Sequence, residues 1–122
     1  MVFMKDTLLV SRTKRFSVEI ITLCGDLSKR GKATPIINQL LRSGTSIGAN
    51  VHEANYAASR ADFINKFQIA LKECYETAYW LEVFHDARIV NDEEFESFYD
   101  SCSRIRKKLA ASITSAKKHL DQ

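Results

Sequence analysis

Residues 42–54 read RSGTSIGANVHEA, and the structure that this stretch adopts decides the fold. Two glycines, three hydroxyl side chains and an asparagine resemble a loop that binds phosphate. A phosphate-binding loop of the GxxxxGK[ST] type needs a preceding strand and a lysine, and no lysine follows Gly48. If the stretch continues as a helix, its small and apolar residues fall on one face. We therefore predict a helix in which Gly44 and Gly48 let a neighbouring helix come close.

The composition of the whole chain favours one helical domain. Its 122 residues include one proline and four glycines, so few residues break a helix. The net charge of +3 permits an acidic partner without demanding one. The N-terminal sequence has no signal-peptide pattern, and no apolar run approaches the roughly 20 residues of a membrane span. Three separated cysteines without a CxxC motif suggest reduced thiols, so we expect a cytoplasmic protein.

Apolar periodicity predicts four helices, at about residues 5–30, 35–58, 60–88 and 92–119. Gly31 is suited to end the first helix, and Pro35 to begin the second. Asn91 and Glu94 form a capping box at the start of the fourth. Short connections join antiparallel neighbours, so we expect an all-α, up-down-up-down antiparallel four-helix bundle.

Metal and nucleophile chemistry find little support in the sequence. A di-iron bundle needs two ExxH motifs and two further glutamates, whereas Glu82 and His85 form one motif and neither His52 nor His119 completes a second. The cysteines lie on or beside apolar stripes, without a histidine placed to activate them. We therefore expect that the protein is not an enzyme and that it has no cofactor and no metal site. A bundle enzyme or metalloprotein is the third hypothesis for the function.

The second helix is unusual on the side opposite its apolar stripe. This side is small and nearly uncharged, and it consists of Arg42, Ser46, Ala49, Asn50 and Glu53. A face that meets solvent should carry several lysines and glutamates, so we interpret it as buried against another subunit. The alternative is an ordinary exposed face of low charge.

One edge of the third helix carries Glu73, Glu76 and Trp80. Buried carboxylates need cationic or amide partners, and Arg42 and Asn50 of the second helix are the candidates. We expect a structural polar cluster rather than an acid–base pair, because no cleft or third catalytic group is evident.

Basic residues are concentrated where the first helix starts and the fourth helix ends. The candidate contacts to nucleic acid are Arg12, Lys14, Arg15, Arg104, Lys107, Lys108, Lys117 and Lys118. In an antiparallel bundle, the start of the first helix and the end of the fourth lie at the same end of the molecule. Arg104, Lys107 and Lys108 continue along the outer face of the fourth helix. The functional interpretation is a footprint for phosphates, without base readout. The alternative is an ordinary solvated surface.

The middle of the chain resembles a known family. The matching sequence motifs are RSGTSIGAN followed by Glu53, the pair Asp62-Phe63, IALKE at residues 69–73 and ETAYWL at residues 76–81. This order is similar to that of the bacterial four helix bundle protein family, also called the 23S rRNA intervening-sequence protein family. His52 departs from the pattern, where a small or aliphatic residue is expected.

The resemblance implies a non-enzymatic bundle that assembles as a ring-like homopentamer. Some members of the family are encoded in insertions within 23S rRNA genes. A related branch is the accessory protein of diversity-generating retroelements, which binds nucleic acid and a reverse transcriptase. Two main functional hypotheses follow for this chain. The first is an oligomeric bundle that binds RNA or DNA backbone, and the second is a protein–protein adaptor with no role for nucleic acid.

Overall fold

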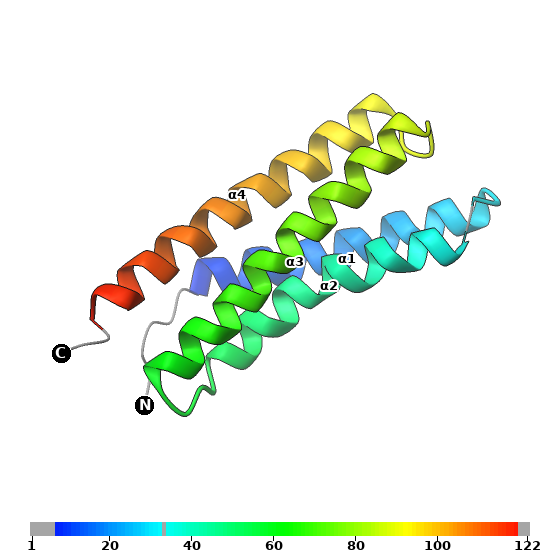
Figure 1. Ribbon diagram of the computed structural model, residues 1–122. Helices are drawn as coiled ribbons and strands as arrows, with labels where there is room; N and C mark the ends of the chain where they lie inside the picture. Colours follow the sequence, from blue (N-terminus) through cyan, green and yellow to red (C-terminus); the bar gives the residue numbers. More distant parts are fainter. Residues whose placement is uncertain (1–6, 33, 120–122) are drawn as a thin grey trace.

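The computed structural model describes residues 7–32 and 34–119, which contain four helices (Figure 1). These are α1 (Thr7–Lys29), α2 (Thr34–Ala54), α3 (Arg60–Asp86) and α4 (Asp92–Lys118). No strand is present among the described residues, so the all-α prediction is confirmed. Figure 1 shows consecutive helices running in opposite directions along the molecule. In the described part of the chain, no helix has the length and apolar character needed to span a membrane.

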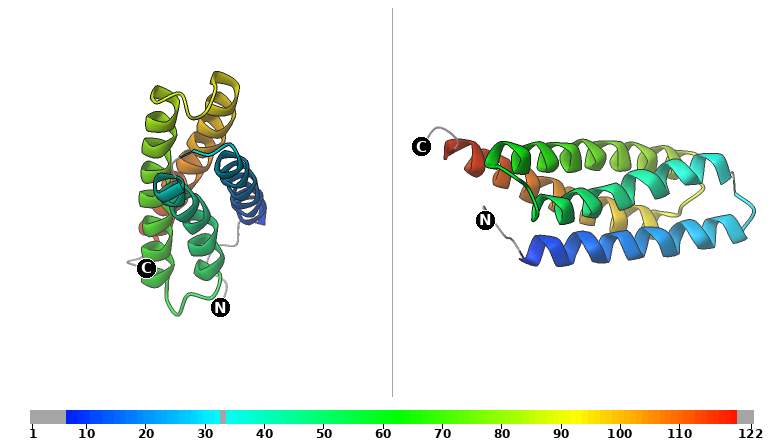
Figure 2. Two further views of the ribbon diagram at one scale, coloured as in Figure 1. Left: turned by 90° about the vertical axis from the view of Figure 1, so that its right-hand side faces the viewer. Right: turned by 90° about the horizontal axis from the view of Figure 1, so that it is seen from below.

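The helices surround one apolar core. In Figure 2 (right), α1 and α3 lie on opposite sides of the bundle, with α2 and α4 between them. The largest fully buried side chains come from all four helices: Leu9, Phe16, Ile20, Leu27, Ile37, Leu40, Ile47, Val51, Phe63, Leu81, Phe84 and Leu109. Burial of one such side chain contributes about 1.5–3 kcal/mol, so this core is the main source of stability.

The glycines of RSGTSIGANVHEA lie where α1 packs against α2. A Cβ atom added at Gly48 would lie 3.0 Å from the backbone oxygen of Thr13 and 3.1 Å from Ser17 Oγ. One added at Gly44 would lie 2.9 Å from the buried side chain of Ile20. The Gly44 distance is shorter than real Cβ contacts, and the Gly48 distances are tighter than most, so a side chain at either position would force α1 or its side chains to shift. The prediction that this stretch is a helix, with glycines where a neighbouring helix comes close, is confirmed.

Two helix ends show the same backbone motif. At the end of α1, Gly31 has a φ of 75°, Lys32 N–H donates to the oxygen of Leu27, and Gly31 N–H donates to Ser28. At the end of α3, Arg88 has a φ of 62° and the corresponding bonds join Ile89 to Phe84 and Arg88 to His85. Both are Schellman motifs, which satisfy the last carbonyls of a helix. Gly31 suits this left-handed position, whereas Arg88 occupies it at a conformational cost.

The predicted capping box at the start of α4 is confirmed. Asn91 Oδ1 accepts from the backbone N–H of Glu94 at 2.8 Å, and Glu94 Oε1 accepts from the N–H of Asn91 at 2.9 Å.

The predicted end of α2 at residue 58 is wrong, because the helix ends at Ala54. Backbone N–H groups of Asn55 and Tyr56 bond to carbonyls three residues back, which tightens the last turn. Ser59 is then free to be the N-cap of α3, with an extended φ of −152°. Apolar periodicity did not reveal this stop, because Ala54 and Ala58 both fit the α2 stripe.

Candidate nucleic-acid interface

The line along which α1 and α4 face each other is here called the α1–α4 seam. It is the most open contact between neighbouring helices. The two helices contact each other much less than α1 contacts α2, or α3 contacts α4. Phe16 meets Phe98 edge-on at 6.2 Å between ring centroids, and Arg30 Nη2 pairs with Glu94 Oε2 at 3.0 Å at one end. Between sparse contacts of this kind, polar side chains can line a surface groove.

A groove of about 380 Å³ follows this seam, which we call the basic groove. Its walls are Arg12, Arg15, Phe16 and Glu19 of α1, and Ser97, Ser101, Arg104 and Ile105 of α4. Helical spacing explains the set, because residues three, four and seven apart share a face of each helix. The groove therefore brings together three of the cations predicted to bind phosphate, Arg12, Arg15 and Arg104.

Ion pairs within the protein engage these cations only weakly. Arg15 Nε lies 3.9 Å from Glu19, and Arg104 Nη2 lies 2.9 Å from Asp100. Both are exposed pairs four residues apart on one helix, which contribute roughly 0.3–0.5 kcal/mol. Arg12 has no ion pair within the described part of the chain. All three guanidinium groups are thus available to an anionic ligand.

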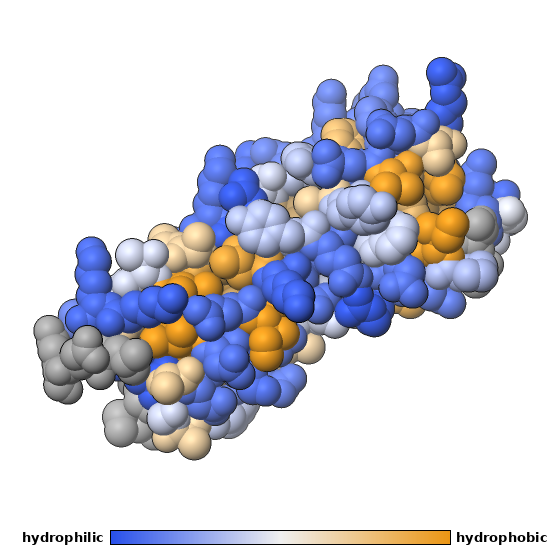
Figure 3. Space-filling model, viewed as in Figure 1, coloured by the Kyte–Doolittle hydropathy of each residue, from blue (hydrophilic) through white to orange (hydrophobic). Residues whose placement is uncertain are grey.

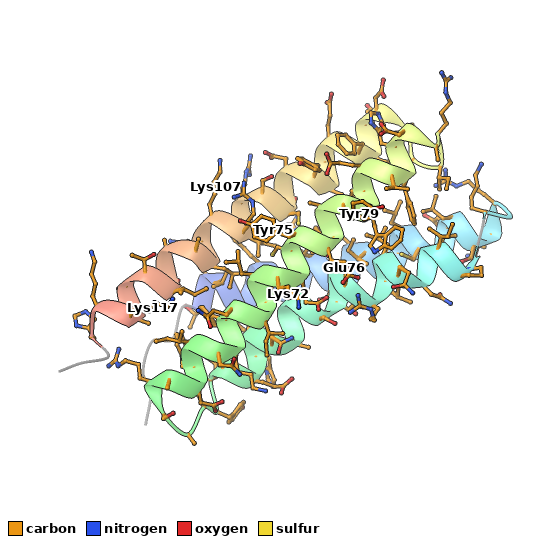
Figure 4. All side chains as sticks on the ribbon, in the orientation of Figure 1. Lys72, Tyr75, Glu76, Tyr79, Lys107 and Lys117 are labelled. Carbon is orange, nitrogen blue, oxygen red and sulfur yellow. The ribbon has the colours of Figure 1, made fainter. Side chains whose placement is uncertain are left out.

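The remaining predicted cations do not all share this groove. Lys14 lines a separate pocket of about 340 Å³ between α1 and α2, beside Gly48 and His52. Lys108 follows Arg104 by one helical turn, so it extends the α4 wall of the basic groove. Lys107, Lys117 and Lys118 are exposed elsewhere on α4, and Figure 4 labels the first two. Seven of the eight residues therefore lie in the basic groove or on the basic half of α4, and Lys14 lies apart on the α2 side of α1.

Charge is divided sharply along α4. Acidic residues occupy its first third, at Asp92, Glu93, Glu94, Glu96 and Asp100. Every charged residue between positions 101 and 119 is basic: Arg104, Arg106, Lys107, Lys108, Lys117 and Lys118. This order complements the helix dipole, and it also places a positive field at one end of the bundle.

The polar cluster expected between α2 and α3 is present. Arg42 Nη1 pairs with Glu73 Oε2 at 3.2 Å, and Arg42 Nη2 pairs with Glu76 Oε2. Trp80 Nε1 donates to the same Glu76 oxygen at 3.4 Å. The Arg42 side chain is 48% exposed, so water screens these pairs. The cluster joins α2 to α3, and its predicted role at a subunit interface stays a prediction.

Asn50, the other predicted partner of these carboxylates, and Glu53 of the outer side of α2 bond elsewhere. The Asn50 amide donates to the Ser46 backbone oxygen at 2.9 Å, because a side chain four residues on can bond back to its own helix. The expected contact between Asn50 and the α3 carboxylates is therefore wrong. Glu53 pairs with Lys66 at 3.2 Å and joins α2 to α3 one level further along.

A buried pair of hydroxyl groups was not predicted. Thr77 Oγ1 donates to Ser43 Oγ at 3.0 Å, and both residues are fully buried between α2 and α3. Ser43 lies one turn from both Leu40 and Ile47, so helical spacing could have placed it on the buried face of α2. The pair satisfies two polar groups within the core.

The cysteines fit a structural role. All three are buried and free. Burial raises the pKa of Cys24 to about 11, and the hydrogen bond with Cys102 together with burial raises the pKa of Cys74. Reactive cysteines need the opposite change in pKa, because the thiolate is the nucleophile. The hydrogen bond with Cys74 lowers the pKa of Cys102, but only 2% of Cys102 is exposed.

His85 also has a structural setting. Its Nε2 lies 2.7 Å from Asp92 Oδ1, and its ring stacks on Phe95 at 4.2 Å between centroids. It therefore ties the end of α3 to the start of α4. Among the described residues, no group of three or more His, Cys, Asp or Glu side chains is placed to hold a metal ion.

A surface pocket of about 700 Å³ lies at the turn between α3 and α4. Its charged lining is mixed: Arg30, Lys32, His85, Asp86, Arg88, Asp92 and Glu94. Glu94 pairs with Arg30, and Asp92 pairs with His85, so these acids are partly neutralised. Its three acidic residues balance its arginines and lysine, whereas the basic groove has three arginines and one acidic residue, so the groove is the better anion site.

Comparison with known proteins gives the family. A family model described as 23S rRNA-intervening sequence protein matches residues 5–111. The chain belongs to this family. This confirms the resemblance to the family that the RSGTSIGAN, IALKE and ETAYWL motifs indicated. The description names a gene context and not a reaction.

A solved structure supports the same family. It is a crystal structure of a protein from the S23 ribosomal protein family of Bacteroides thetaiotaomicron, described as having unknown function. The two chains are 44% identical, and the match covers 86% of this chain and 97% of the other, with a TM-score of 0.84. The comparison with curated proteins gave no match.

Proposed function

We propose that this 23S rRNA-intervening sequence family protein is a non-enzymatic, cytoplasmic, homo-oligomeric bundle that binds the backbone of RNA or DNA. The observation that carries the proposal is the basic groove, where Arg12, Arg15 and Arg104 converge from two helices with only weak ion pairs of their own. Guanidinium groups suit phosphates because their planar fork can donate two parallel hydrogen bonds.

The form of the groove favours backbone contact over base readout. Its cations come from α1 and α4, with serines between them that can donate to phosphate oxygens. No helix protrudes from the bundle to enter a DNA major groove, as far as the described residues go (Figure 1). We therefore expect binding that depends steeply on salt and little on sequence.

Self-association is part of the proposal. In the single chain, Leu8, Val18 and Ile21 of α1 are 51%, 57% and 54% exposed. The outer side of α2 is also small and weakly charged, with Ala49 exposed and Ser46 half-buried. Both surfaces suit contact with further copies, and the homopentamer is the assembly that the sequence resemblance implies.

The test is the mass of the purified protein by light scattering, in low and high salt, with and without a short RNA duplex. The proposal predicts a stable oligomer that takes up RNA at low salt and releases it at high salt. A monomer that ignores RNA even at low salt would contradict both parts of the proposal.

An adaptor without nucleic acid is the second candidate, and the exposed apolar residues of α1 favour it. A reverse transcriptase is the partner implied by the retroelement branch. This candidate predicts a protein partner that still co-purifies after nuclease treatment. Loss of all partners on nuclease treatment would decide for the first candidate.

A further inference from the structure

We propose that Tyr75 and Tyr79 of α3 form a stacking platform for unpaired bases of a single-stranded nucleic acid. The inference rests on the proposed nucleic-acid function, but it concerns a different surface and a different kind of contact. The basic groove would hold phosphates of any strand, whereas the platform would select strands whose bases are free to stack.

The two tyrosines are exposed in the middle of a long helix. Their exposed fractions are 58% for Tyr75 and 57% for Tyr79. They are four residues apart, so they lie on the same face with a rise of about 6 Å between them. A strand with splayed bases can place successive bases against aromatic rings of this spacing, and every base has a face that can stack.

Neighbouring side chains hold both rings. The guanidinium carbon of Arg106 on α4 lies 5.9 Å from the centroid of the Tyr75 ring. The Tyr79 ring packs edge-on against Trp80, with 5.1 Å between centroids. A ring fixed in this way loses less conformational entropy when a base stacks on it.

The charges beside the platform match a phosphate backbone. Figure 4 shows Lys72 on α3 in line with the tyrosines, and Lys107 on the adjacent α4. Lys72, Arg106 and Lys107 form no ion pair within residues 7–32 and 34–119. Glu76 lies on the α2 side, where it is paired with Arg42. The platform thus combines aromatic rings with nearby cations, the usual pattern for single-strand binding.

The hydropathy of this face argues against an obligate protein interface as the reason for the exposed rings. Figure 3 shows hydrophobic residues in separate patches, divided by hydrophilic surface, over the α3 side of the molecule. Obligate interfaces are instead large and hydrophobic, resembling the core of a domain. Charge complementarity favours nucleic acid as the occupant.

The experiment compares affinities for a 12-nucleotide single-stranded RNA, the same sequence as DNA, and an RNA duplex. The variant Tyr75→Ala/Tyr79→Ala should bind both single strands at least about 10-fold more weakly, since removal of one base–aromatic stack costs roughly 5- to 150-fold. Its affinity for the duplex should stay within about 2-fold of wild type. The slope of log affinity against log salt concentration should be unchanged for all three nucleic acids.

Two controls separate stacking from other roles. Tyr75→Phe/Tyr79→Phe keeps the rings and should retain single-strand binding. Tyr56→Ala removes a tyrosine that is 78% exposed in the α2–α3 turn, and it should have no effect. Light scattering of each variant reports its assembly.

The outcomes distinguish this inference from the proposed function. If wild type binds no nucleic acid of any form, the function itself fails. If wild type binds and the alanine variant binds single strands equally well, the platform is overturned while the function stands. If the alanine variant changes the mass of the assembly, the tyrosines are a subunit contact, which also overturns the platform.

Discussion

α1 packs against two neighbours in opposite ways. Along α2, the glycines at positions 44 and 48 bring the two helices so close that an added Cβ atom would force its neighbours to shift. Along α4, the same helix leaves a groove of about 380 Å³ lined mainly by polar side chains, three of them arginines. The closed contact contributes stability, and the open α1–α4 seam leaves polar side chains exposed for a ligand. The same helix can therefore serve folding on one side and binding on another.

The largest expected effect comes from filling the closed contact. Gly48→Leu should destabilise the protein by about 1–3 kcal/mol or more, because the added atoms meet the Thr13 backbone, which cannot move aside as a side chain can. Chemical denaturation measures the change. A variant as stable as wild type would show that α1 and α2 are not this close.

Gly25→Ala is the counterpart of Gly48→Leu, and it should raise stability. Gly25 lies in α1, and a Cβ atom added there meets nothing within 4 Å. Because glycine inside a helix costs roughly 0.5–1 kcal/mol relative to alanine, this variant should be more stable by a similar amount. The same denaturation experiment reports it, and a decrease in stability would mean that α1 is covered at this position.

Glu94→Gln should weaken the end of the α1–α4 seam, and its effect should depend on pH. Burial alone would raise the pKa of Glu94, but hydrogen bonds from the Asn91 N–H and Arg30 hold it below its ordinary value of 4.5. A depressed pKa in the folded state contributes stability above pH 4.5 that is lost as pH falls. Wild type should therefore be more stable than Glu94→Gln at pH 7, and the difference should shrink below pH 4.5.

The pH dependence identifies the cause of the Glu94 effect. Equal differences in stability at pH 7 and pH 3 would show that the charge of Glu94 is not involved. A smaller destabilisation in Glu94→Gln than in Glu94→Ala at pH 7 would show that the capping bond itself persists.

The smallest effect on stability is expected from Ser101→Leu, the open-seam counterpart of Gly48→Leu. Ser101 lines the basic groove, where space exists for a larger side chain beside Phe16 and Ile105. We expect a change of less than about 0.5 kcal/mol, typical of surface substitutions, together with weaker RNA binding. Strong destabilisation would mean that this seam is packed as closely as the other.

Most of the features that the sequence predicted depend on one helix at a time. Gly44, Gly48, Gly31 and the Asn91–Glu94 capping box each follow from helix geometry or from the chemistry of a helix end. Spacing along α2 and α3 was also sufficient to pair Arg42 with Glu73 and Glu76.

The features that the sequence did not predict depend on how helices are arranged around one another. Periodicity gives the angle between Lys14 and Arg12 on α1, but not which neighbouring helix lies at each angle. It therefore grouped Lys14 with Arg12 and Arg15, although Lys14 lies on the α2 side. The exposure of Tyr75 and Tyr79 was also not predicted, because it depends on how α3 meets its neighbouring helices.

The central claim is that the basic groove binds phosphates, and the salt dependence of RNA affinity tests it most directly. The variant Arg12→Ser/Arg15→Ser/Arg104→Ser is compared with wild type. A control variant removes the same charge at the opposite end of the bundle through Lys29→Ser, Lys32→Ser and Arg88→Gly.

For the wild type and the control variant, a plot of log affinity against log salt concentration should have the same slope. For the groove variant, the slope should be shallower by about 0.7–0.9 for each phosphate that the protein no longer neutralises, with weaker binding at low salt. Identical slopes for all three proteins would contradict the claim, because the groove would then neutralise no phosphates.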